Sequence, residues 1–80
     1  MEFDENKLRA VFAEALGIPE TDVVPTLEYN TIPQWDSLAH MRLIAEIEEA
    51  FDIMIDSDDL IDMSSFAISI DMVRKYVAEA

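Results

Sequence analysis

The stretch that decides the fold is WDSLAHMRLIAEIEEAFDI, residues 35–53. From Ser37 to Phe51 its apolar side chains recur at steps of three and four, which is the spacing of an amphipathic helix. Asp36 stands immediately before this segment, where a carboxylate can accept a hydrogen bond from a backbone N–H of the first helical turn. The sequence therefore predicts a helix over residues 37–51 that begins at an Asp36 N-cap.

This predicted helix carries two apolar stripes rather than one. The first stripe is expected to face the core and consists of Leu43, Ile44, Ile47, Ala50 and Phe51. The second stripe consists of Ser37, Leu38, Met41, Ala45 and Glu48. Spacing alone leaves two interpretations open: Leu38 and Met41 pack under the neighbouring loop, or they form an exposed patch that docks other proteins. In the second interpretation Glu48 faces solvent, and Glu48→Lys is expected to be near-neutral for stability.

The segments on either side of this helix also have helical patterns. Residues Asn6–Leu16 predict a helix with Asp4 as its N-cap and Gly17 at the left-handed position that ends many helices. Two further helices are expected later in the chain, a short one over Ser57–Ile61 and a longer one over Ser65–Ala78. No convincing alternating strand pattern occurs, so we predict an all-α fold, a four-helix bundle with a short third helix.

Residues 17–36 contain all three prolines and show no sustained period, which predicts a long ordered loop between the first two helices. Trp35 is expected to staple this loop to the following helix, and His40 to be a partly buried structural residue. Met54 and Met63 are expected in the core. The apolar residues expected to pin the loop are Ile18, Val23, Val24, Leu27, Tyr29, Ile32 and Trp35. Those expected to be buried in the last helix are Phe66, Ile70, Val73 and Val77.

The composition limits both the size and the partners of the protein. Eighty residues predict one domain over residues 1–80. Five Lys and Arg against eighteen Asp and Glu give a formal net charge of −13. Binding to nucleic acid depends on Lys and Arg, so this charge argues against it and favours basic protein partners. The chain has no cysteine, and therefore no disulfide, thiolate metal site or cysteine nucleophile.

The sequence gives no sign of an enzyme. Ser37 lacks a G-x-S-x-G elbow, and His40, the one histidine, is expected to point towards the core. If Ser37 is chemically important, modification by another enzyme is the better hypothesis. The acidic run Asp56–Asp62 lacks the glycine and terminal glutamate of a calcium loop, so no metal site is expected. Apolar runs are too short for a membrane span and residues 1–5 are acidic, which predicts a cytoplasmic protein. We also expect a monomer.

Trp35-Asp36-Ser37-Leu38, at a loop-to-helix junction in a short acidic chain, resembles the attachment motif of acyl carrier proteins. The resemblance extends to Leu16-Gly17-Ile18, to residues 22–25 and to residues 44–53. It implies that Ser37 Oγ carries 4′-phosphopantetheine, donated from coenzyme A by a metal-dependent phosphopantetheinyl transferase that docks at Asp36 and Leu38. It also implies a four-helix bundle of acyl-carrier type and acyl thioesters on the arm, presented to enzymes with basic surfaces. The implied docking residues are Leu38, Met41, Ala45, Glu48 and Glu49.

The departures from the family pattern bear on the pathway. Ala39, His40 and Arg42 soften the acidic face that fatty-acid carriers commonly have. Asp-Ser-Leu differs from the Gly-Gly-His/Asp-Ser signature of peptidyl carriers, and the Trp-Asp-Ser-Leu start is similar to discrete carriers of specialised pathways. We therefore expect a carrier for a fatty-acid or polyketide-like pathway. The alternatives are an aminoacyl, D-alanyl or peptidyl carrier on the same fold, and an acidic helical interaction module without a prosthetic group.

Overall fold

The computed structural model describes residues 3–79, so Met1 and Glu2 of the acidic N-terminal stretch lie outside the described residues. Its helices are α1 (Glu5–Leu16), α2 (Ser37–Phe51), α3 (Ser57–Asp62) and α4 (Phe66–Glu79), with a short 3-10 turn, η1 (Glu20–Asp22), in the first connection. An isolated antiparallel bridge joins Glu28 to Ser65. The all-α prediction is confirmed, and the bounds of α2 are those that the sequence predicted.

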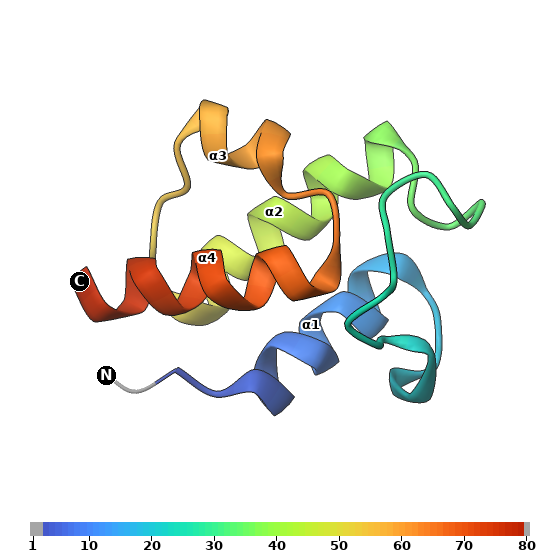
Figure 1. The fold of residues 1–80 in the computed structure, drawn as a ribbon, viewed down its shortest axis with the longest axis horizontal. Helices are drawn as coiled ribbons and strands as arrows, with labels where there is room; N and C mark the ends of the chain where they lie inside the picture. Colours follow the sequence, from blue (N-terminus) through green and yellow to red (C-terminus); the bar gives the residue numbers. More distant parts are fainter. Residues whose placement is uncertain (1–2, 80) are drawn as a thin grey trace.

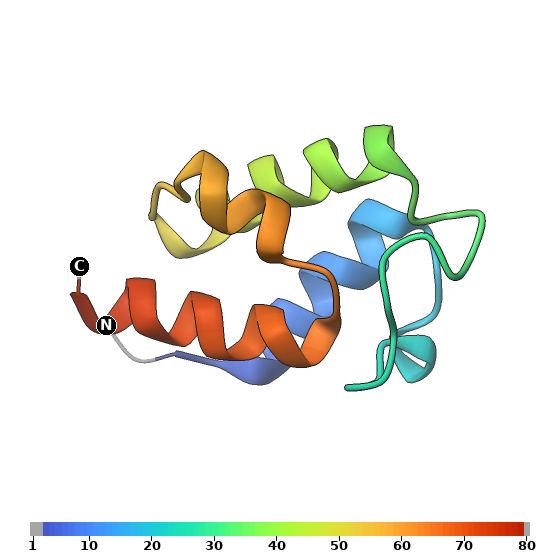
Figure 2. The ribbon, with the colours of Figure 1, turned by 45° about the horizontal axis from the view of Figure 1, so that its top comes forward.

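The helices form a small bundle with α3 lying across its top. α1 packs against α2, and α4 runs beside them, while α3 bridges the upper side between α2 and α4 (Figure 1). The long connection, residues 17–36, wraps around one end of the bundle and delivers the chain to the start of α2 (Figure 2). Within residues 3–79 no helix is both long enough and apolar enough to cross a membrane.

Side chains and left-handed residues set the helix ends. The Asp4 side chain accepts hydrogen bonds from the backbone N–H groups of Asn6 and Lys7 at the start of α1. Gly17 ends α1 at φ +67°, a conformation in which glycine has no steric penalty. Asp52 ends α2 in the same left-handed conformation, with φ +56° and its N–H bonded to the Glu48 carbonyl. The sequence predicted the first two caps but not the third.

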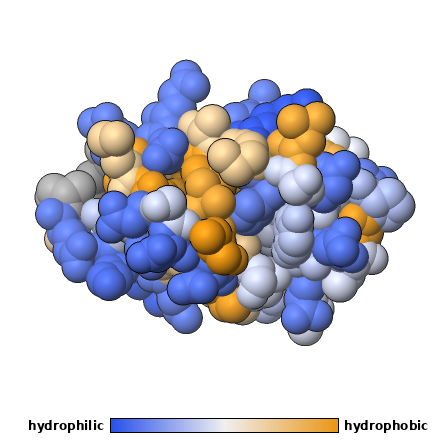
Figure 3. Space-filling view, turned by 90° about the horizontal axis from the view of Figure 1, so that it is seen from above, coloured by the Kyte–Doolittle hydropathy of each residue, from blue (hydrophilic) through white to orange (hydrophobic). Residues whose placement is uncertain are grey.

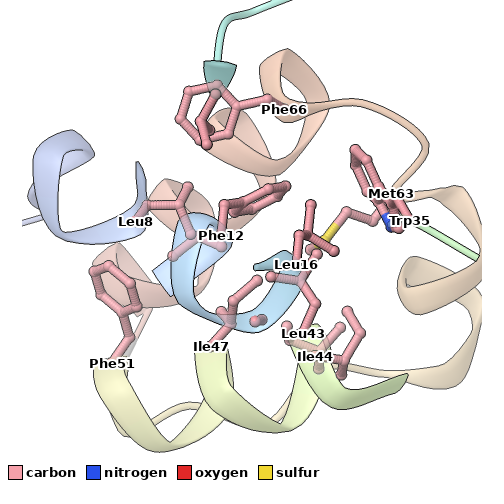
Figure 4. Packing of buried hydrophobic residues seen from close by; sticks show 14 of the residues in the cluster. Leu8, Phe12, Leu16, Trp35, Leu43, Ile44, Ile47, Phe51, Met63 and Phe66 are labelled. Carbon is pink, nitrogen blue, oxygen red and sulfur yellow. The ribbon is translucent and has the colours of Figure 1, made fainter. Parts of the chain in front are cut away.

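The core is built around aromatic rings that join α1, the long connection and α4. Phe12 of α1 lies edge-on to Trp35 at 5.4 Å between centroids and to Phe66 of α4 at 4.9 Å. All three rings are fully buried (Figure 4). The predicted core stripe of α2 faces these rings, with Leu43 and Ile47 fully buried. Aromatic side chains bury more apolar surface than other residues, so these three rings contribute substantially to the stability of so small a domain.

Three residues expected in the core are exposed. Val24 is 42% exposed because the turn after η1 directs Val23 inward and its neighbour outward. Tyr29 is 37% exposed, with one face of its ring against His40. Met54 is 84% exposed because Ile53 and Ile55 point inward from an extended segment, where alternate side chains face opposite sides. Of the other predicted loop anchors, Leu27 and Trp35 are buried, while Ile18 and Ile32 are half-buried against the core. Met63 of the predicted core is buried.

In α4 the burial of two neighbouring residues differs from the prediction. Ile70, expected in the core, is half-buried, and Ser69 is fully buried. The Ser69 hydroxyl donates a hydrogen bond to the Phe66 carbonyl at 2.6 Å, which satisfies its polar atom inside the core. Ser69 is therefore tolerated in the core face of α4, where Phe66, Val73 and Val77 are buried as predicted.

α3 has only six residues, and side chains from the other helices hold it in place. Its N-cap Asp56 makes no side-chain capping bond; instead the Asp56 N–H donates to the Tyr76 hydroxyl of α4 at 3.0 Å. The same hydroxyl donates to Asp59 Oδ2. From α2, Glu48 Oε2 accepts a hydrogen bond from the Ile55 N–H at 2.9 Å, just before α3 begins. The position of α3 thus depends on α2 and α4 more than on its own helical bonds.

Tyr76→Phe is expected to loosen α3 and to change the response of the protein to alkaline pH. The hydrogen bond to Asp59 raises the pKa of the Tyr76 phenol above its ordinary value of 10.0. A folded-state pKa above the unfolded one stabilises the fold below pH 10 and loses that contribution as pH rises through the folded pKa. Tyr76→Phe should therefore lower the free energy of unfolding by about 1 kcal/mol at neutral pH and flatten its decline above pH 10.

Urea unfolding between neutral and alkaline pH measures both effects, with Tyr29→Phe as the control because it leaves the Asp56–Tyr76–Asp59 contacts intact. An equal alkaline decline in the wild type and in Tyr76→Phe would contradict this role of the hydroxyl.

Candidate functional site

Ser37 is the first residue of α2, and its side chain is exposed. The carboxylate of Asp36 is directed to the helix rather than to Ser37, since its Oδ1 accepts a hydrogen bond from the Ala39 N–H at 2.9 Å. The first N–H groups of a helix lack intrahelical partners and form the positive end of the helix dipole. A negatively charged group attached to Ser37 Oγ is therefore favoured at this position.

A buried hydrogen-bond chain lies under Ser37. Trp35 Nε1–H donates to Nδ1 of His40 at 3.0 Å, and His40 Nε2 lies 2.9 Å from the carbonyl oxygen of Leu60 in α3. An indole N–H only donates and a carbonyl only accepts, so the imidazole accepts at Nδ1 and carries its proton on Nε2. Trp35 is fully buried and His40 is 8% exposed, which confirms the structural roles that the sequence predicted. These two hydrogen bonds hold Trp35 and His40, and so fix the backbone on both sides of Ser37.

A groove of about 280 Å³ opens beside Ser37, between α2 and α3. Its polar lining residues include Ser37 and Ser64, which are both exposed. The view from above shows hydrophobic side chains gathered across this face, with hydrophilic ones around them (Figure 3). Such a surface suits a hydrocarbon group held at a polar opening. The groove is lined by Tyr29, Ser37, His40, Met41, Leu60, Ile61, Met63 and Ser64.

The surface around the groove is acidic. Within residues 3–79 the two ion pairs are Glu5–Arg9 and Asp71–Arg74, on α1 and α4, so no carboxylate of α2 or α3 is neutralised by a cation. Arg42 is the one cation of α2. Over the described residues, no group of three or more acidic or histidine side chains is arranged to hold a metal ion. The negative potential of this face favours approach by a basic surface.

The second stripe of α2 is a surface feature. Leu38 is 71% exposed and Met41 is 54% exposed, while Ala45 and Glu49 are exposed further along the helix. The interpretation in which Leu38 and Met41 pack under the loop is therefore wrong, because more than half of each side chain is exposed to solvent. Large exposed apolar side chains next to a functional group are typical of a docking surface.

Glu48 differs from the rest of this stripe. Its side chain is half-buried and binds the Ile55 N–H, because the left-handed residue Asp52 turns the chain back towards the last turn of α2. Glu48→Lys removes the acceptor of this part-buried hydrogen bond, so the structure predicts a loss of stability where the sequence predicted a near-neutral change. Glu49 is the acidic residue of α2 that tests docking without this complication.

The sequence did not predict four of the groove-lining residues as part of a site. Tyr29, from the long connection, and Leu60, Ile61 and Ser64, from α3 and the segment after it, complete the groove. Ile61 is 74% exposed. An adjacent Leu-Ile pair in a short, otherwise acidic helix is a signal that could have pointed to these two residues.

Comparison with known proteins agrees with this geometry. Residues 6–67 match the family model described as the phosphopantetheine attachment site. The acyl carrier protein of Desulforapulum autotrophicum is 40% identical over 72 residues, which cover 89% of this chain and 94% of that protein. The acyl carrier protein of Karelsulcia muelleri is 33% identical over 72 residues, covering 90% and 82%.

A solved structure agrees as well. The solution structure of a holo acyl carrier protein from Geobacter metallireducens superimposes with a TM-score of 0.82 at 25% identity, covering 94% of this chain and 86% of that one. A small helical carrier with a serine at the start of its second helix is thus the class that fold and site define. The chain belongs to the phosphopantetheine attachment site family, among the acyl carrier proteins, and its prosthetic group is 4′-phosphopantetheine.

Two substitutions on α2 separate its surface stripe from its core stripe. Met41→Ala removes a side chain that is 54% exposed and should change the free energy of unfolding by no more than about 0.5 kcal/mol. Leu43→Ala, two residues along, removes a fully buried side chain and should cost about 2–5 kcal/mol. Urea unfolding of both variants is the measurement. Equal losses of stability would contradict the assignment of two distinct faces.

Proposed function

We propose that Ser37 is the residue that carries the phosphopantetheine arm. The observation that carries this proposal is the exposed Ser37 hydroxyl at the capped start of α2, beside an apolar groove. The neighbouring Asp36 carboxylate is committed to the Ala39 N–H, which leaves the Ser37 hydroxyl accessible to a modifying enzyme. The family relationship supports the proposal, because the matched residues 6–67 include Trp35-Asp36-Ser37-Leu38.

In the proposed modification, Ser37 Oγ attacks a phosphorus of the coenzyme A pyrophosphate. The hydroxyl gives up its proton, an Oγ–P bond forms, and the P–O bond to adenosine 3′,5′-bisphosphate breaks. A phosphopantetheinyl transferase with a divalent metal supports this step. The resulting phosphodiester places a negative charge at the α2 N-terminus, where the helix dipole and the free N–H groups of the first turn stabilise it.

The chain itself supplies position and shelter rather than reactivity. The terminal thiol of the bound arm provides the thioester chemistry that this chain, which has no cysteine, lacks. Met41, Leu60 and Ile61 line the groove beside Ser37 and can cover an apolar acyl group. Burial of apolar surface there stabilises the loaded protein and keeps its cargo from water.

For partner recognition we propose a docking face on α2 made of Leu38, Met41, Ala45, Glu48 and Glu49. Its exposed apolar residues supply the buried centre of a contact, and its acids steer a basic partner, mainly through the association rate. Glu48 also has a structural role, through Ile55, so its contribution to docking is the hardest to isolate. The partners proposed are the transferase and the separate enzymes that load and process the acyl group.

For the pathway we propose acyl intermediates of a fatty-acid or polyketide-like route, handled by a carrier that is not itself an enzyme. The relatives named above are acyl carrier proteins, which supports an acyl cargo over an aminoacyl, D-alanyl or peptidyl one. The groove points the same way, because a lining of Met41, Leu60, Ile61 and Met63 suits hydrocarbon better than a charged amine.

Ser37→Ala is expected to abolish modification while leaving the fold intact, because the hydroxyl is exposed and Asp36 performs the capping. Incubation with coenzyme A and a broad-specificity transferase, followed by intact-mass spectrometry, should show one phosphopantetheine on the wild type and none on the variant. Circular dichroism should show unchanged helix content. Modification of the variant would show that another residue carries the arm.

Two variants test the docking face, and a third serves as the matched control. Met41→Ala and Glu49→Lys should both be modified, but more slowly than the wild type, whereas Glu79→Lys at the far end of α4 should be modified at the wild-type rate. Equal rates for all three variants would contradict the docking face and leave the Ser37 assignment standing.

A further inference from the structure

His40 lies at the inner end of the groove, between the groove and the core. It lines the groove together with Met63, and both side chains are almost completely buried. The imidazole stacks on Trp35 at 6.0 Å between centroids, and Tyr29 lies edge-on to it at 5.3 Å. The ring therefore closes the groove on the side that leads towards the aromatic core.

Hydrogen bonds hold this imidazole from two directions. Trp35 in the long connection donates to Nδ1, and Nε2 donates to the Leu60 carbonyl in α3. Displacing the ring leaves a buried indole N–H and a backbone carbonyl without partners, which is more costly than losing an ordinary surface contact. A flexible apolar side chain at residue 40 would move aside at far lower cost. His40 is therefore a rigid end wall.

The region behind His40 has no room for a longer group. Trp35, Phe12 and Phe66 are fully buried and in edge-to-face contact at 5.4 and 4.9 Å. Within the described residues, every buried side-chain nitrogen and oxygen has a hydrogen-bond partner, so no polar atom there awaits a ligand. A chain that grows past His40 must disturb both the hydrogen bonds and the aromatic packing.

We infer that His40 sets the length of the acyl group that this carrier shelters, and that the preferred cargo is a short acyl chain. The inference rests on the proposed attachment at Ser37. The groove volume of about 280 Å³ holds roughly nine methylene-sized groups, if each takes about the 30 Å³ of a water molecule. An octanoyl group fits within this limit, and a dodecanoyl group exceeds it.

The test uses the complete protein loaded by a broad-specificity transferase from acetyl-, butanoyl-, hexanoyl-, octanoyl-, decanoyl- and dodecanoyl-coenzyme A. Intact mass verifies the loading, and the thermal midpoint of each species is measured. We expect the midpoint to rise from acetyl to octanoyl by roughly 4–8 °C and then to stop rising or to fall. A midpoint that climbs steadily through dodecanoyl, or that does not depend on the chain, would overturn the inference.

Two variants test whether His40 is the cause of the limit. In His40→Gln the longer side chain can still donate to Leu60, so the limit should stay at octanoyl. In His40→Asn the amide oxygen can still accept from Trp35, but the shorter side chain cannot reach the Leu60 carbonyl and leaves space there at the end of the groove. The acyl length at which the thermal midpoint stops rising should therefore move to decanoyl or dodecanoyl. The acyl forms of each variant are compared only with one another, so a general loss of stability in that variant does not affect the chain length at which the midpoint stops rising.

An unchanged limit in His40→Asn would overturn the role of His40. Failure of the proposed function looks different, because the wild type would then gain no mass on incubation with any acyl-coenzyme A, before any melting experiment.

Discussion

The hydrogen-bond chain from Trp35 through His40 to Leu60 is the interaction on which the rest of this structure depends. It joins three separate segments: the long connection, the second helix and the short third helix. Since Ser37 lies between Trp35 and His40 in sequence, residues on both sides of this serine, the proposed attachment site, are anchored in the core while Ser37 itself is exposed. A rigid start of α2 is what a modifying enzyme needs to find its target atom repeatedly in one place.

The same hydrogen-bond chain also helps to determine the shape of the groove, because it holds α3. α3 is too short to be stable alone, and its position comes from His40, Glu48 and Tyr76 on the neighbouring helices. Because α3 supplies Leu60 and Ile61 to the groove, these three bonds also determine the shape of the surface beside Ser37. Structure and proposed function are thus coupled in one small region, where side-chain hydrogen bonds from α2 and α4 position the short helix α3.

Much of this arrangement could be predicted from the sequence, because it depends on local rules. The period of α2, its Asp36 cap and the Gly17 stop follow from side chains close to one another in the chain, and the structure has them as predicted. The groove depends on contacts far apart in sequence, such as His40 with Leu60 or Tyr29 with His40, and no periodicity encodes these. The same reason explains Glu48: its partner Ile55 comes within reach only because Asp52 adopts a left-handed conformation.

The most direct test of this account is the protonation and exchange of the two buried rings by NMR. Long-range proton–nitrogen spectra at neutral pH should show His40 as the tautomer with its proton on Nε2 and a bare, hydrogen-bonded Nδ1. The Trp35 indole N–H should exchange with solvent as slowly as the backbone amides of the α2 core stripe. A proton on Nδ1, or an indole N–H that exchanges as fast as one in an unfolded chain, would contradict the claim that this bond anchors the site.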